Sequence, residues 1–146
     1  TLDQIVSRQD CCIERDPDVP VSDLGGLTPR QALLANPPIY FERNLRNIVA
    51  IARAHDANVM LMTFAVNPNE WGIGSAPYYL EATLEHNAII ERLGTELDVR
   101  IFDFASAMPL DQEYWIGSIH FSATGEQVHA SLIADYLVRS GLLPRQ

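Results

Sequence analysis

Lysine is absent from this 146-residue sequence, and all ten of its basic residues are arginine. The absence excludes chemistry that needs a lysine amine, such as Schiff-base formation or a P-loop phosphate site. Positive charge is scarce overall, because 19 acidic residues against 10 basic ones give a net charge of −9. Such a surface repels a phosphate backbone, so we expect no general nucleic-acid partner.

Long hydrophobic runs and cysteine are also scarce. No apolar stretch approaches the ~20 residues that a membrane helix needs, and no targeting segment is recognisable. We therefore expect no membrane span. For the location of the protein in the cell we expect the cytoplasm, or a place that the sequence does not identify. The two cysteines, Cys11 and Cys12, are adjacent, which places their Cα atoms ~3.8 Å apart, below the usual disulfide range. We expect free thiols in a reducing compartment, and a strained disulfide between the two neighbours is the alternative.

The rest of the composition is globular, with 47% hydrophobic and 20% charged residues. A chain of this length ordinarily forms one domain. Residues 1–38 are punctuated by Pro and Gly, which predicts an irregular N-terminal segment with short helices. One such helix is expected over residues 1–9, and another after Thr28, which is suited to the N-cap position with Pro29 following. Residues 39–146 predict a regular α/β part.

Helical and strand patterns alternate in that second part. Apolar residues at helical spacing predict helices over residues 39–55, 78–97 and 123–140, and short apolar runs predict buried parallel strands over residues 59–64 and 99–104. This order predicts an α/β fold with right-handed crossovers. Strands buried on both faces need neighbours, so two strands leave the sheet incomplete. We expect the partner strands to lie outside this chain.

Ligands of open α/β sheets bind beyond the carboxyl ends of the strands. Two predicted loops lie there, over residues 65–77 and 105–121. His120 stands near the end of the second loop, just before Ser122, a suitable N-cap for the last helix. A histidine held there is a candidate general base. The alternative is a surface or hydrogen-bonded histidine without a catalytic task.

Other polar residues predict structural roles. Asn87 shares the apolar face of its helix with Leu84 and Ile90, so we expect it to be buried and to anchor a loop by hydrogen bonds. Asp103, at the end of the second strand, is expected to anchor a loop rather than to act in catalysis. We expect neither a metal nor a cofactor, because no Gly-rich phosphate loop is present and the remaining histidines lack metal-ligand spacing: His55, His86 and His129.

Five blocks of the sequence resemble the SGNH hydrolases, the GDSL-type esterases and lipases, from about Ile39 to Leu143. They follow one another in the order and spacing of that family. The last block resembles the family's final motif, in which a histidine precedes a glycine-containing turn into a helix. The blocks are Tyr40–Val49, Val59–Thr63, Glu85–Ile90, Val99–Asp103 and His120–Gly125.

The resemblance implies a three-layer α/β/α fold with a parallel sheet of flavodoxin-like type, present here as its C-terminal half. It also implies a serine carboxylic-ester hydrolase for small-molecule esters, in which His120 takes the proton of the nucleophilic serine. That serine, and the glycine and asparagine that complete the oxyanion hole, match no segment of this chain. The resemblance therefore implies a missing N-terminal half or another subunit as the partner that supplies them.

The chain also departs from the family's pattern. The aspartate that orients the histidine is expected three residues before it, where Gly117 stands. Asp103, Asp111 or Glu113 could replace it, or a backbone carbonyl could orient the histidine of a dyad. If none does, the alternative is a binding or assembly module that keeps the fold without activity. An unrelated small binding domain is a third hypothesis. The loop and terminal serines lack the family's strand-then-serine context: Ser7, Ser22, Ser75, Ser106 and Ser118.

Overall fold

The computed structural model describes residues 19–20, 25–70, 72 and 76–143. The helix predicted over residues 1–9 and the cysteine pair lie outside the described residues. The first described helix, α1 (Pro29–Ala35), starts as predicted. The Thr28 side chain accepts a hydrogen bond from the Gln31 N–H, and the Gln31 side chain accepts one from the Thr28 N–H. This reciprocal capping, with Pro29 at the first helical position, confirms the predicted N-terminus.

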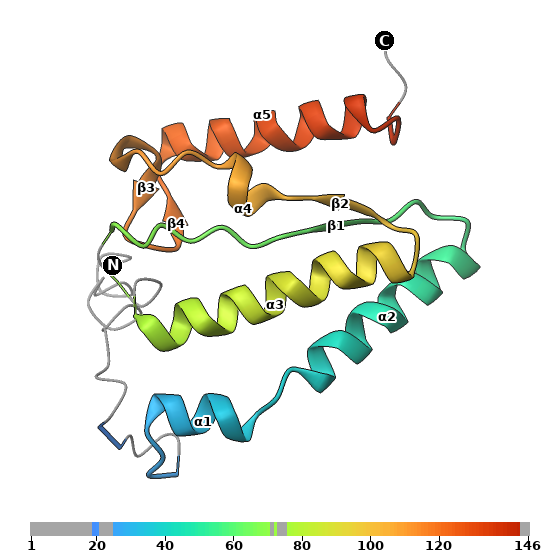
Figure 1. Cartoon of the computed structure of the whole chain (residues 1–146). Helices are drawn as coiled ribbons and strands as arrows, with labels where there is room; N and C mark the ends of the chain where they lie inside the picture. Colours follow the sequence, from blue (N-terminus) through green and yellow to red (C-terminus); the bar gives the residue numbers. More distant parts are fainter. Residues whose placement is uncertain (1–18, 21–24, 71, 73–75, 144–146) are drawn as a thin grey trace, which may run out of the picture.

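The regular elements alternate as the apolar patterns predict. The strands pair in parallel with Leu61 opposite Ile101. In Figure 1, α2 and α3 lie on one side of this strand pair and α5 lies on the other. The α/β order is confirmed, but among the described residues the parallel sheet has two strands, not the several of a full flavodoxin-like sheet. The bounds are α2 (Ile39–Ala54), β1 (Met60–Met62), α3 (Pro77–Glu96), β2 (Arg100–Phe102) and α5 (Ala123–Arg139).

The loop predicted over residues 105–121 is wrong, because this segment contains regular structure. It holds a short helix, α4 (Phe104–Ala107), and a 3-10 turn, η4 (Gln112–Tyr114). An antiparallel hairpin of β3 (Trp115–Ile116) and β4 (His120–Phe121) follows. Gly117 makes the hairpin possible, because its φ of 71° lies in the left-handed region that glycine adopts without a steric cost.

Two apolar clusters form the core on the two sides of the strand pair. Leu61 joins the cluster of α2 and α3, in which Leu93 is fully buried. Phe102 joins the cluster beneath α5, together with Trp115 of the hairpin. The apolar face on which the sequence places Leu84 is not buried at that residue, since this side chain is 68% exposed. The buried residues of α3 run through Asn87, Ile89, Ile90, Leu93 and Gly94, and Leu84 lies beside that line.

No helix among the described residues is long and apolar enough to cross a membrane.

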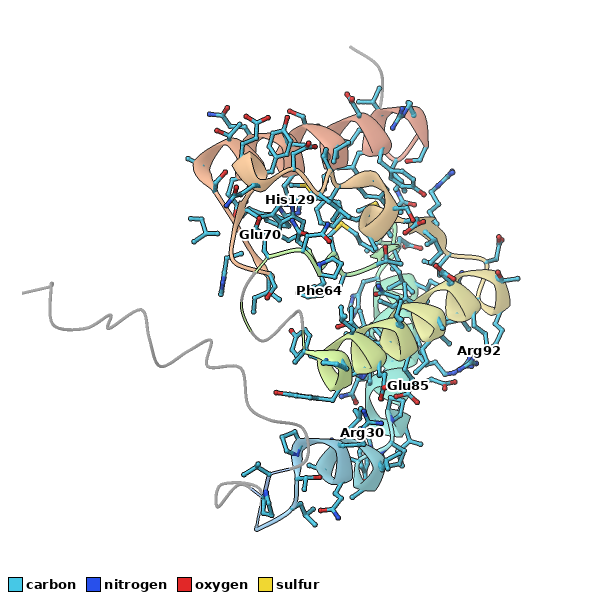
Figure 2. All side chains as sticks on the ribbon, turned by 60° about the vertical axis from the view of Figure 1, so that its left-hand side comes forward. Arg30, Phe64, Glu70, Glu85, Arg92 and His129 are labelled. Atoms are coloured by element: carbon cyan, nitrogen blue, oxygen red, sulfur yellow. The ribbon has the colours of Figure 1, made fainter. Side chains whose placement is uncertain are left out.

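Four charged side chains link α2 to α3. Arg92, labelled in Figure 2, donates to Glu42 at 2.7 Å and to Glu96 at 2.8 Å. Arg46 donates to Glu42 at 2.8 Å and also to Glu96. Hydrogen bonds from Arg92 first, and from Arg46 second, lower the pKa of both glutamates below the ordinary value. The cluster joins two helices that are far apart in the sequence.

Glu42→Gln is expected to weaken the dependence of the free energy of unfolding on pH in the acid range. A carboxyl whose pKa is lower in the folded state stabilises the fold above its unfolded pKa, ordinarily 4.5. That contribution is lost as the pH falls through the folded-state pKa. The free energy of unfolding, measured in urea from pH 6 downward to about pH 3, should therefore depend less on pH in the variant. Glu91→Gln, an exposed change on α3 outside the cluster, is the control. Equal acid slopes in both variants would contradict the prediction.

Candidate active site

His120 is the first residue of β4, and β4 lies near the carboxyl ends of the parallel strands, at the left of Figure 1. Its backbone pairs with Ile116 across the hairpin, and its side chain is exposed. Among the described residues, no hydrogen bond or ion pair involves its imidazole. The ring is therefore available to a substrate, but no described side chain orients it.

The hairpin that carries His120 is fixed at both ends. The buried Trp115 donates from its indole Nε1 to the Pro109 carbonyl at 2.7 Å. After β4, the Ser122 N–H donates to the Tyr114 carbonyl at 2.9 Å. The Ser122 hydroxyl accepts from the Gly125 N–H at 3.0 Å, which confirms Ser122 as the N-cap of α5. His120 thus stands on a hairpin held by hydrogen bonds at both ends, and its own side chain is exposed.

Asn67 is a residue to which the sequence patterns alone do not point. It is fully buried, and it joins three segments at this end of the molecule. Its side-chain amide donates to the Leu110 carbonyl at 2.9 Å, and its backbone N–H donates to the Ser118 carbonyl in the hairpin at 2.9 Å. Its Oδ1 accepts from the Asn69 N–H at 3.0 Å. This last bond is an Asx turn, which the Asn-Pro-Asn sequence after a strand could have indicated.

Asp103 anchors the loop after β2, which confirms the structural role predicted for it. Its Oδ1 accepts from the Thr63 hydroxyl at 3.0 Å and from the Ser106 N–H at 3.2 Å. Hydrogen bonding from Ser106 first, and from Thr63 as well, lowers the pKa of this carboxyl. The Thr63 hydroxyl in turn accepts from the Ala105 N–H at 2.9 Å. Asp103 thus holds the ends of both parallel strands together.

The three acids considered as substitutes for the missing aspartate make no described contact with His120. The Asp103 carboxylate accepts hydrogen bonds at the ends of the parallel strands, whereas Asp111 and Glu113 are exposed around η4. Gly117 occupies the expected position of the aspartate. Its positive φ would cost an L-residue of order 1 kcal/mol. A turn glycine therefore stands where the sequence resemblance implies an orienting carboxylate.

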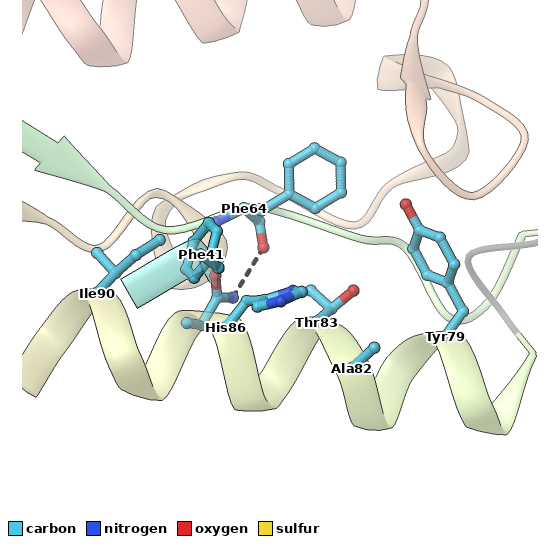
Figure 3. Close-up of a pocket in the computed structure, with 8 residues that line it drawn as sticks. Phe41, Phe64, Tyr79, Ala82, Thr83, His86 and Ile90 are labelled. Atoms are coloured by element: carbon cyan, nitrogen blue, oxygen red, sulfur yellow. Dashed lines mark hydrogen bonds between the residues drawn. The ribbon is translucent and has the colours of Figure 1, made fainter. Parts of the chain in front are cut away.

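Asn87 is buried and anchors the chain that leaves β1, as the sequence predicts. Its Oδ1 accepts from the Phe64 N–H at 2.8 Å, and its Nδ2 donates to the Phe64 carbonyl at 2.9 Å. The side-chain amide thus occupies the position that a neighbouring strand would take at Phe64. The dashed line in Figure 3 marks the bond at the Phe64 carbonyl, above α3.

Asn87→Ala should lower the free energy of unfolding by about 1–3 kcal/mol, because it leaves both backbone groups of Phe64 without their partner. Urea unfolding followed by circular dichroism measures this loss. Asn47→Ala, the same change at an exposed position of α2, should alter stability by less than about 0.5 kcal/mol. Equal stability of the two variants would contradict the anchoring role.

A mostly apolar cavity of about 370 Å³ lies beside Asn87, between α3, Phe41 of α2 and Phe64. Phe64 is 48% exposed. The rings of Phe41 and His86 lie 4.4 Å apart between centroids. Burial raises the pKa of Tyr79, which borders the cavity at the N-terminal end of α3. The cavity therefore offers apolar surface next to the segment that leaves β1 toward the hairpin of His120.

Metal-binding residues are not gathered anywhere in the described part of the chain. No three His, Cys, Asp or Glu side chains there lie close enough together to hold a metal ion. His129 packs instead against aromatic rings, with centroids 4.6 Å from Phe104 and 5.1 Å from Phe121.

Comparison with known proteins finds a likeness in structure but none in sequence. No model of a protein family matches the sequence, and no curated protein matches it. A solved GDSL-like lipase from Bacteroides thetaiotaomicron has a similar structure, with a TM-score of 0.59 and 15% sequence identity. The match covers 79% of this chain and 60% of the lipase chain. At this identity the likeness shows the fold alone: this chain folds like part of that lipase and spans 60% of its length.

Proposed function

We propose that this chain is the histidine-bearing, C-terminal half of an SGNH-type hydrolase that cleaves small-molecule esters, and that His120 is its general base. The observation that carries the proposal is the exposed His120 on a fixed hairpin, at the carboxyl ends of the strands, in a fold like that of a GDSL-like lipase. In open α/β folds this is the end where ligands bind.

Ester hydrolysis by a serine requires a base, such as a histidine, next to the serine hydroxyl. A serine hydroxyl is a weak nucleophile, so a neighbouring imidazole must take its proton as the oxygen attacks the ester carbonyl. The same imidazole then gives the proton to the departing alcohol, and water releases the acyl group in a second round. Backbone and side-chain N–H groups stabilise the oxyanion of each tetrahedral intermediate. In this proposal His120 performs the proton transfers.

The nucleophile comes from outside this chain. Among the described serines, Ser118 is 1% exposed, and Ser122 is used by the N-cap of α5. The hydroxyls of Ser131 and Ser140 donate to carbonyls of α5. Ser106 is exposed on α4, but it makes no described contact with His120. Ser7, Ser22 and Ser75 lie outside the described residues. The serine and the oxyanion donors are therefore assigned to a missing N-terminal half or another subunit.

A fluorophosphonate probe, which reacts with an activated serine, tests this assignment. The complete polypeptide encoded by the gene, or its complex with the partner subunit, should be labelled on a serine outside the 146 residues. Mass spectrometry of the labelled peptide identifies that serine. His120→Ala should abolish the labelling. Labelling of a serine within the 146-residue chain would contradict the proposal.

Gly117 favours a second candidate, a binding or assembly module that keeps the fold without activity. The turn of the hairpin uses a glycine where the family has its orienting aspartate, and no described residue replaces that carboxylate. A folded complete polypeptide that is neither labelled nor active would support this candidate against the hydrolase.

A further inference from the structure

The apolar cavity beside α3 has the size of a small-molecule binding pocket. Its volume is about 370 Å³, and ligand pockets of proteins start at roughly 300 Å³. A cavity of roughly 150 Å³ already holds a benzene molecule in a protein core. The Phe64 side chain, which borders the cavity, is 48% exposed, so this wall reaches solvent. The cavity therefore has room for two fused rings and an entrance for them.

Aromatic residues dominate the wall of this cavity. Four of its eight lining residues carry a ring: Phe41, Phe64, Tyr79 and His86. The rings of Phe41 on α2 and His86 on α3 lie 4.4 Å apart between centroids, so they join the two helices at this wall. Aromatic rings pack favourably against one another in offset-stacked and edge-on arrangements. The wall therefore suits a flat aromatic molecule better than a flexible chain.

Three hydrogen-bonding side chains follow one another along the same wall. Tyr79, Thr83 and His86 are four and three residues apart, the spacing that places side chains on one face of a helix. Figure 3 shows them on the side of α3 that faces the segment of Phe64. Among the described residues, nothing forms a hydrogen bond with their hydroxyl groups or with the imidazole of His86. We call these three side chains the polar row; it is available to a ligand.

Charge limits the kind of ligand that fits. In the described part of the chain, no Asp, Glu or Arg side chain lines the cavity. A charge that is buried without a partner costs a large amount of free energy. The net charge of −9 also repels an anion before it reaches the cavity. The surroundings therefore favour an uncharged molecule.

We propose that the cavity binds a small, uncharged aromatic molecule of one or two fused rings that carries an N–H or O–H group. Its rings occupy the apolar space between α3 and Phe41, and its polar group forms a hydrogen bond with the polar row. Because a buried polar group needs such a partner, the row favours these molecules over plain hydrocarbons. The proposal goes beyond ester hydrolysis and does not depend on it.

Indole and indene test both parts of the proposal, because they share a bicyclic shape and only indole has an N–H group. Indole should bind the 146-residue chain and the complete polypeptide with a Kd below about 1 mM, and indene about tenfold more weakly. Chemical shifts of the backbone amides measure both affinities, and they should change most in the part of α3 from Tyr79 to Ile90. A Kd for indole above about 1 mM, shift changes centred elsewhere, or equal affinity for indene would overturn the proposal.

A pair of α3 variants tests the location of the bound indole. Ala82 borders the cavity, and Ala88 is exposed on the same helix. Ala82→Trp should fill the cavity and weaken indole binding about tenfold, whereas Ala88→Trp should leave it unchanged, provided that both variants keep the wild-type circular dichroism. Equal affinity of the two variants for indole would place the ligand elsewhere and overturn the proposal.

A combined variant tests the role of the polar row. Tyr79→Phe, Thr83→Val and His86→Phe together remove its hydrogen-bonding groups with little change in shape. Indole binding should weaken about tenfold, and indene binding should stay within about twofold of the wild type. Indene thus also reports whether the cavity is intact. The same loss for both ligands, or no loss for indole, would contradict selection by hydrogen bonding.

Another segment of the complete polypeptide is the competing occupant of the cavity. Indole binding by the 146-residue chain that disappears in the complete polypeptide would assign the cavity to that segment and overturn the proposal. The same Kd in both forms, within about threefold, is the expected result.

Discussion

His120→Ala is expected to lower kcat/KM for p-nitrophenyl acetate about 10³- to 10⁴-fold in the complete polypeptide. The loss is this large because the serine hydroxyl keeps its proton when no base is adjacent to it. Stability should change by less than about 0.5 kcal/mol, because the exposed imidazole makes no described hydrogen bond. A large loss of rate without a loss of stability separates a catalytic side chain from a structural one.

The matched control for this variant is His55→Ala. His55 is also exposed, and it lies at the end of α2, at the opposite end of β1 from the hairpin. Free imidazole groups hydrolyse p-nitrophenyl acetate slowly, so the control measures the background contributed by an ordinary surface histidine. Equal rates for the two variants would contradict the assignment of His120 as the base.

Gly125→Ala is expected to cause the largest loss of stability, about 3 kcal/mol. Gly125 lies in the first turn of α5, against η4. A Cβ atom added there would lie 1.9 Å from the Tyr114 carbonyl oxygen, a contact with backbone that no rotamer change relieves. In the variant, either α5 or the hairpin must move, and this movement strains the Ser122 N-cap that joins them. Urea unfolding of the variant measures the effect.

The sign of this result is informative, because helix propensity alone predicts the opposite. Alanine is a better helix former than glycine by about 1 kcal/mol, so an unobstructed change would stabilise α5. Ala130→Gly, at an exposed position of the same helix, should cost about 1 kcal/mol and calibrates that preference. A Gly125→Ala variant as stable as the wild type would contradict the close contact of α5 with η4.

Much of the fold could be predicted because its signals are local. The starts of α1 and α5 depend on Thr28 and Ser122, whose side chains cap the first turn in ways that a sequence displays directly. The apolar runs gave both parallel strands. The exposure of Leu84 could not be predicted, because it depends on the direction from which β1 and α2 approach α3, and helical periodicity does not determine that direction.

The candidate site was predicted only in part, because much of it depends on contacts between segments that are far apart in the sequence. His120 could be placed near the strand ends from the order of the elements. Its hairpin was missed, because two-residue strands are too short for an alternating pattern and the Gly117 turn determines them. Asn67 joins segments up to about fifty residues apart in sequence, and such contacts exist only after the chain has folded.

Ester hydrolysis by the 146-residue chain, compared with the complete polypeptide encoded by its gene or the complex with its partner subunit, tests the central claim most directly. The account predicts that the 146-residue chain shows no turnover of p-nitrophenyl acetate above the His55→Ala and His120→Ala background, whereas the complete form turns over and loses this activity with His120→Ala. Turnover by the 146-residue chain alone that depends on His120, or a folded complete form without activity, would contradict it.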